Sequence, residues 1–174
     1  EDVGGGVAFR ETKTDFTPAS LKRTEIPTDM AIPNEGFFVV RKGRENMLTR
    51  AGNFQLTPTG QLLTPQGYPV LDDGNSPILI QPNGGPWKVS SDGTILQAGT
   101  TQRLAIVKPK SLGDLVQAGE NLYRSLAPVQ QVLPEKRWVS PGYIEVSGVE
   151  PTMEMTAMVE ASRLFEANVN LMRA

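Results

Sequence analysis

The sequence contains no cysteine and no histidine. Without cysteine it can form no disulfide, no thiolate nucleophile and no thiolate metal site. Without histidine it lacks the commonest general base and the commonest transition-metal ligand. Catalysis would have to rest on carboxylates, lysine, tyrosine or a bare hydroxyl, and we expect no catalytic residue, no metal site, no cofactor and no small-molecule substrate.

Long apolar runs and basic runs are also missing. A membrane helix needs roughly 20 consecutive apolar residues, and no run approaches that length, so we expect no membrane span. The 17 basic and 19 acidic side chains give a net charge of −2. No basic run resembles those that neutralise phosphates, so we expect no nucleic-acid partner. The sequence begins without Met or a secretory signal, and we interpret that start as a cut within a longer protein.

Turn residues, by contrast, are abundant. The 174 residues suffice for one hydrophobic core, and they include 17 glycines and 14 prolines, which indicates many turns and short elements. From residue 29 to residue 107, strand-like runs alternate with turns, which predicts a mainly β fold with an antiparallel β sandwich or barrel-like body. Residues 37–41 and 47–50 give a hairpin signal. Residues 103–107, the most apolar run, predict a central strand.

The remainder of the body has a weaker pattern. Residues 109–134 are predicted to be irregular, with a helical turn near 112–116, and residues 138–146 return to a strand-like pattern. The residues that recur in the strand-like runs should form the core: Phe37, Phe38, Phe54, Leu62, Ile80, Val89, Leu104 and Ile106.

A C-terminal α-helix is predicted from residue 151 to residue 174, because helix formers dominate there and neither Pro nor Gly follows Pro151. One row of side chains, spaced alternately by three and four residues, forms a heptad seam: Met155, Met158, Ser162, Phe165, Val169 and Met172. The helix could dock on its own β body, as amphipathic helices usually do, or it could face a neighbouring subunit. Its place at the end of the chain, with no stop signal before Ala174, favours the second interpretation.

Two residue pairs invite a chemical interpretation. Asp72 and Asp73 would suit calcium ligation or glycoside hydrolysis. Neighbouring strand residues point to opposite faces, however, and the following Gly74 favours a turn. Trp87 and Trp138 would suit a sugar-stacking platform, but tryptophans of a β-rich domain are more often core or rim residues, and we predict core positions for both.

Four segments resemble flagellar rod and hook proteins. Residues 29–38, DMAIPNEGFF, are similar to that family's D-x-A-I-x-G-x-G-F-F element, and residues 48–56, LTRAGNFQL, to its Y-T-R-A-G-N-F strand. Residues 142–147, GYIEVS, resemble its G-x-L-E-x-S-N-V-N entry into the terminal helix, and residues 163–168, RLFEAN, resemble the R-x-Y/F-E-A-N stretch of that helix. The sequence departs from the pattern at Gly148 and Glu150, where asparagines are usual.

The resemblance implies a structural subunit of the periplasmic rod and not an enzyme. Such a subunit leaves the cell by type III export without a cleaved signal peptide. Its partners would be copies of itself and other rod and hook proteins, joined through terminal helices and hence through the six seam residues. Among family members the chain is most similar to the proximal-rod protein, with the distal-rod protein a close second.

The family's N-terminal helix is missing here, which sets the expected domain division. Residues 1–28 would be a linker and first strand leading from that helix, residues 29–146 a β-rich core domain, and residues 147–174 the assembly helix. One alternative from a different class stays open, a β-rich cell-wall polysaccharide-binding module or carboxylate-based hydrolase, because a growing rod must cross the peptidoglycan layer.

Overall fold

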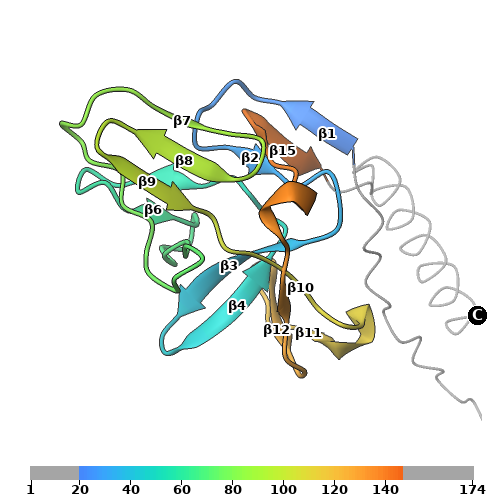
Figure 1. Ribbon diagram of the computed structural model, residues 1–174. Helices are drawn as coiled ribbons and strands as arrows, with labels where there is room; N and C mark the ends of the chain where they lie inside the picture. The colour runs from blue at the N-terminus through green and yellow to red at the C-terminus, as the bar shows by residue number, and fades with distance from the viewer. Residues whose placement is uncertain (1–19, 147–174) are drawn as a thin grey trace, which may run out of the picture.

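The computed structural model describes residues 20–146, which form a mainly β body of short antiparallel strands (Figure 1). The C-terminal helix and all six seam residues lie outside this range. Within it, no helix is long and apolar enough to cross a membrane.

The largest sheet has six strands in the order β11-β12-β4-β3-β10-β13. Its centre is the hairpin of β3 (Phe37–Lys42) and β4 (Glu45–Thr49), in which Val40 lies opposite Met47, so the predicted hairpin is confirmed. Gly43 in the turn has a φ of 65°, a conformation that favours glycine. The other four strands are β10 (Ile106–Lys108), β11 (Leu115–Gln117), β12 (Leu122–Ser125) and β13 (Gln130–Gln131).

Smaller sheets surround this one. A three-stranded sheet consists of β7 (Trp87–Val89), β8 (Thr94–Gln97) and β9 (Thr100–Arg103). Three strand pairs complete the body: β1 (Ser20–Arg23) with β15 (Tyr143–Val146), β2 (Met30–Ala31) with β14 (Ser140–Pro141), and β5 (Gln55–Leu56) with β6 (Leu62–Leu63). Two short 3-10 helices, η1 (Leu112–Asp114) and η2 (Pro134–Lys136), lie in the connections.

The alternation of side chains along β3 supplies two apolar clusters. Phe38 and Val40 belong to the main core, whereas Phe37 and Val39 belong to a second cluster, because successive strand residues point to opposite faces of a sheet. The eight core residues predicted from the sequence are all buried. That prediction is confirmed.

The apolar run 103–107 contributes to the centre of the fold, but it is divided between two sheets. β9 ends at Arg103 and β10 begins at Ile106. Between them, Leu104 forms a β-bridge with Asp72, and the Ala105 amide donates to the Leu71 carbonyl at 2.9 Å. A single continuous strand was therefore the wrong prediction, because the middle of the run pairs with a third segment.

Residues 109–134 are not irregular, as they contain β11, β12 and β13. The predicted helical turn is confirmed as η1. The three strands escaped sequence analysis because they are short and carry polar residues such as Gln117 and Arg124, which hide the apolar alternation. The six-stranded sheet ends in β11 on one side and β13 on the other, so it is open, and residues 20–146 form no closed barrel.

Leu104→Ala is expected to lower the free energy of unfolding by about 2–5 kcal/mol, because truncating a fully buried leucine removes apolar contacts and leaves a cavity. Leu104 is 0% exposed in the main core. Urea unfolding measures the difference. Leu79→Ala, at an exposed leucine, is the matched control and should cost far less. A parent-like midpoint for Leu104→Ala would show that the core lies elsewhere.

Candidate assembly site

The strands β1 and β15 bring the two ends of the described region together (Figure 1). Ser20 lies opposite Val146 in this antiparallel pair, and Arg23 lies opposite Tyr143. The turn beyond β1 is fixed as well, because the amides of Thr24 and Glu25 both donate to the Gly142 carbonyl, at 2.8 and 3.2 Å. The segments before residue 20 and after residue 146 therefore join the body at one place.

The guanidinium of Arg50 holds this junction to the main sheet. Its Nε and Nη2 donate to the two carboxylate oxygens of Glu145, each at 2.9 Å. Its remaining N–H groups donate at 2.8 Å to three carbonyls of the loop before β3, those of Ile32, Asn34 and Gly36. A guanidinium has five N–H donors, so every donor of Arg50 is used.

Both partners of this ion pair are largely shielded from water. The side chains of Arg50 and Glu145 are 19% and 13% exposed. The Arg50 guanidinium lies 5.9 Å from the centre of the Phe37 ring, which in turn meets the Tyr123 ring edge-on at 6.0 Å. Burial, and to a smaller extent the negative charge of Glu145, raises the pKa of the Tyr123 hydroxyl above its ordinary value. The junction is thus a charged pair set against aromatic rings.

Two segments singled out in the sequence meet around this pair. Arg50 belongs to the segment 48–56 and Glu145 to the segment 142–147, but sequence analysis gave neither residue a role. Gly52 shows why the first segment packs closely: a Cβ there would lie 1.6 Å from the Met30 carbonyl oxygen. The Met30 amide donates to the Gly52 carbonyl at 2.9 Å. The opposite charges of Arg50 and Glu145, each within a segment that resembles the family, were the signal in the sequence that could have predicted their contact.

The aspartates have structural roles. Asp72 accepts from the Ser76 amide at 2.8 Å within a turn, which confirms the turn interpretation. Asp73 accepts from both terminal nitrogens of Arg137, at 3.0 and 2.9 Å, and the Arg137 side chain is only 2% exposed. With Asp73 engaged in this way, the two carboxylates do not form a pair available for acid–base work. Among residues 20–146, no group of three or more acidic side chains is placed to hold a metal ion.

The two tryptophans lie in different environments, and only Trp138 departs from the prediction. Trp87 is partly buried and packs against the main core. Trp138 is 56% exposed, so its predicted core position is wrong. Its neighbours Arg137 and Val139 are buried, and in extended backbone the residue between two inward-pointing residues points outward. Trp138 is therefore exposed because of its place in the alternation, although tryptophan usually prefers the core.

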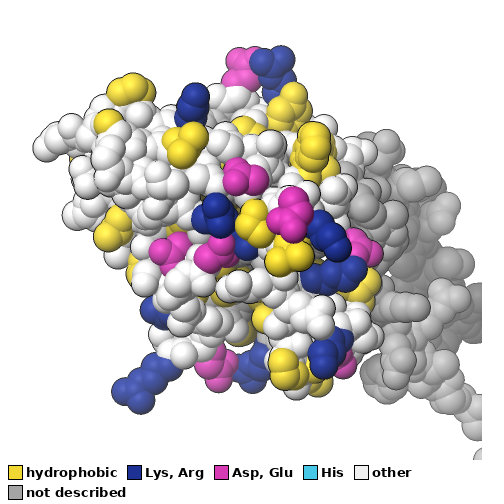
Figure 2. All heavy atoms as spheres, in the orientation of Figure 1, with side chains coloured by type: hydrophobic (Ala, Val, Ile, Leu, Met, Phe, Trp, Pro, Cys, Tyr) yellow, Lys and Arg dark blue, Asp and Glu magenta, His cyan; other side chains and the backbone are white. Residues whose placement is uncertain are grey.

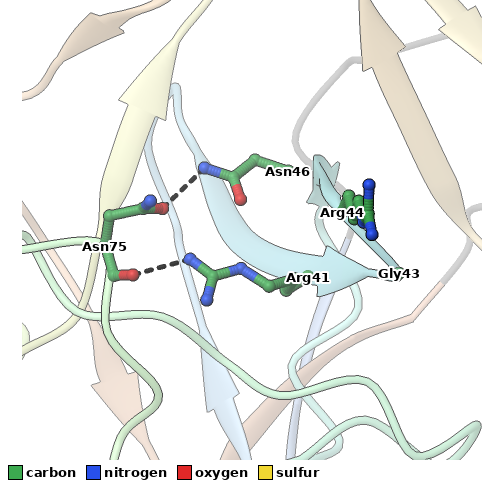
Figure 3. A pocket seen from close by; sticks show the side chains of 5 residues that line it. All are labelled: Arg41, Gly43, Arg44, Asn46 and Asn75. Atoms are coloured by element: carbon green, nitrogen blue, oxygen red, sulfur yellow. Dashed lines mark hydrogen bonds between the residues drawn. The ribbon is translucent and has the colours of Figure 1, made fainter.

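A shallow hollow lies beside the tip of the β3–β4 hairpin (Figure 3). Asn75 lines one side of it and accepts hydrogen bonds of 2.6 Å from the Arg41 guanidinium and the Asn46 side-chain amide of the hairpin. Its other lining residues are Gly43 and Arg44. The lining contains no carboxylate, hydroxyl or amine that could serve as a base or nucleophile. Its hydrogen bonds hold the hairpin against Asn75 and provide no catalytic group.

The charged groups near that tip are paired across the surface. Lys42 donates to the Glu120 carboxylate at 2.6 Å, and the Tyr68 hydroxyl donates to the same oxygen at 2.9 Å. The hydrogen bond from Lys42 is the main cause that lowers the pKa of Glu120, and it likewise raises the pKa of Lys42. In Figure 2 charges of both signs are mixed over the visible face, without a single-sign field that would attract a polyanion.

Two regions of the chain, one in the β body and one that includes the C-terminal segment, match models of known protein families. Residues 31–97 match the family model described as the flagellar hook protein FlgE/F/G D1 domain, and residues 140–174 match that of the flagellar basal body rod FlgEFG protein C-terminal region. The FlgF rod protein of Caulobacter vibrioides is 34% identical over 91% of this chain, which spans 65% of the relative's length. The FlgF of Salmonella typhimurium is 36% identical over 90% of the chain and 67% of the relative. The FlgG of Bacillus subtilis is 32% identical, with 97% and 69% covered.

Arg50→Ala is expected to destabilise the body by about 3 kcal/mol, because it removes the charged partner of the shielded Glu145 carboxylate and the hydrogen bonds that Arg50 donates to three carbonyls. Urea unfolding measures the loss. Arg23→Ala is the matched control, since the Arg23–Glu25 pair is about 70% exposed on both sides, and exposed pairs contribute about 1 kcal/mol or less. Similar losses of stability for the two variants would show that the Arg50–Glu145 pair does not hold the junction to the main sheet.

Tyr123→Phe is expected to reduce the loss of stability at alkaline pH. The raised pKa means that the folded state favours the protonated hydroxyl, whose ordinary pKa is 10.0. The resulting stability is fully present below the unfolded pKa and is lost as the pH rises from about 10 through the folded pKa. Across that range the unfolding free energy of the parent should fall by more than that of the variant, so the difference between the two should change with pH. A constant difference would contradict the assignment.

Proposed function

Because the chain belongs to the flagellar basal-body rod protein family, we propose that it is a structural subunit of the flagellar rod in the periplasm. Its partners would be copies of itself and other rod and hook proteins, and it would reach them by type III export. The observation that carries the proposal is the match of two family models, one to the body and one to the C-terminal region. The FlgF relatives favour the proximal rod, with FlgG as the runner-up.

Residues 147–174 would be the assembly helix of this subunit. The heptad seam supports the assignment, since each large apolar side chain transferred from water contributes about 1.5–3 kcal/mol. Several such residues can offset the entropy of ordering a helix. The pairing of β1 with β15 adds support, because a helix entering at residue 147 and a segment arriving at residue 19 would start from the same clamped junction.

The division of the chain follows from the same reasoning. Residues 1–28 would lead from an N-terminal helix into the body, residues 29–146 would form the body, and the assembly helix would complete the subunit. A polysaccharide-binding module or carboxylate-based hydrolase has no support from the comparisons. The geometry does not favour it either, because Arg137 engages the Asp73 carboxylate and Trp87 packs against the main core.

Replacing Phe165 by Asp in the complete protein, produced in cells, tests the assembly role of the seam. A charge buried without a partner is strongly unfavourable, so rods should fail to form and swimming should stop while export continues. Asn170→Asp is the matched control, because it adds a charge to the same segment beside the seam and should leave rods intact.

Circular dichroism of the purified variants checks that the β body still folds. Normal rods and normal swimming with Phe165→Asp would refute the role of the seam. Loss of rods with both variants would show that the segment tolerates no added charge, and the seam would then not be specific.

A further inference from the structure

Trp138 is held rigidly in an exposed position. On one side, Arg137 is buried and donates to the Val132 and Leu104 carbonyls at 2.6 and 2.9 Å, in addition to its paired bonds with Asp73. On the other side, Val139 is 1% exposed, and its amide donates to the Ser91 carbonyl at 2.7 Å. The backbone at Trp138 is therefore fixed at both neighbours, while more than half of its side chain faces water.

A rigidly displayed tryptophan is typical of a protein-binding surface, because tryptophan is enriched among residues that dominate binding energy. Leu133, on the other side of η2, is also exposed. Glu135 and Lys136 lie between them, and neither has an ion-pair partner among residues 20–146. We call these four residues the tryptophan surface. Two exposed apolar residues with charges of both signs between them suit a protein better than a sugar.

A second exposed apolar surface lies around the β11–β12 hairpin. Leu126 is 70% exposed, and its amide donates to the Asp114 carbonyl at 2.8 Å, which places it beside η1. Leu112 and Val116 are exposed on the same segment. Lys110 and Asp114 flank them, and within the described residues neither has an ion-pair partner. We call these five residues the hairpin surface.

We propose that the tryptophan surface of one copy of this chain docks on the hairpin surface of the next copy. The charges are complementary, since Glu135 can face Lys110 and Lys136 can face Asp114 of the next copy, while Trp138 and Leu133 cover its exposed leucines. Two different surfaces in contact make a head-to-tail interface, which repeats along an open assembly, whereas one surface meeting itself would close a dimer. The inference rests on the proposed function, because it needs a polymer.

Thiol cross-linking tests the contact, and the absence of cysteine from the chain makes introduced thiols specific. The complete protein carries Leu126→Cys together with Trp138→Cys, and purified basal bodies are treated with a short bismaleimide. The double variant should give a ladder of dimers, trimers and larger species, and each single variant should give none. Leu79→Cys with Trp138→Cys is the control, at a leucine outside both surfaces, and should also give no ladder.

A second pair keeps the test valid if the loss of Trp138 prevents assembly. Glu135→Cys with Leu126→Cys retains the tryptophan and should give the same ladder. Rods that form without a ladder from either pair would overturn this contact and leave the proposed function intact. Dimers from a single variant, or links to a different protein, would also overturn it. Absence of the parent protein from basal bodies would instead overturn the proposed function itself.

Discussion

The structure depends on how one guanidinium distributes its five donors. Arg50 binds the carboxylate of Glu145, 95 residues away in the sequence, and three carbonyls of the loop that leads into β3. These bonds fix the start of the central hairpin against β15, and β15 fixes β1. Lysine could not replace this group, because an ammonium has three donors and no planar fork that matches a carboxylate. The position of the β1–β15 pair relative to the main sheet thus depends strongly on one side chain.

Short strands explain why such side chains are needed. Several strands of the body have only two or three residues, so their ladders supply few backbone hydrogen bonds, and buried backbone groups need partners elsewhere. Arg50 and Arg137 supply donors to carbonyls in this way. Gln102 does the same with its amide, accepting from the Leu79 amide at 3.0 Å and donating to the Leu79 carbonyl at 2.5 Å. Side-chain bonds thereby replace strand pairing where the chain is too irregular to pair.

Whether a contact is local or joins residues far apart in the sequence decides how much the sequence could predict. Local alternation is visible in the sequence, which is why the β3–β4 hairpin and buried residues such as Phe38 and Leu104 were found. Arg50 with Glu145 and Asp73 with Arg137 were missed, because pairing across many residues leaves no local spacing. The short strands β11 and β12 were missed because polar residues such as Gln117 and Arg124 interrupt their apolar pattern. Trp138 was misplaced because residue type was weighed without its two inward-pointing neighbours. The seam residues follow a clear heptad pattern, but no described contact tests them.

A heptad seam alone would not fix how one subunit sits on the next. A repeat of seven residues presents nearly the same surface after each heptad, and methionines adapt to many partners, so slipped registers would differ little in energy. The proposed contact of Trp138 with the hairpin surface would remove that degeneracy, because a rigid side chain that docks on one surface of a neighbouring copy sets a single register. The rigidity of Trp138 also lowers the entropy lost on docking. Pairing with Asp73 need not add much net stability, because the buried Arg137 guanidinium is desolvated in forming it, but the pair and the carbonyls that Arg137 binds hold the backbone beside Trp138 in place, as the proposed contact would require.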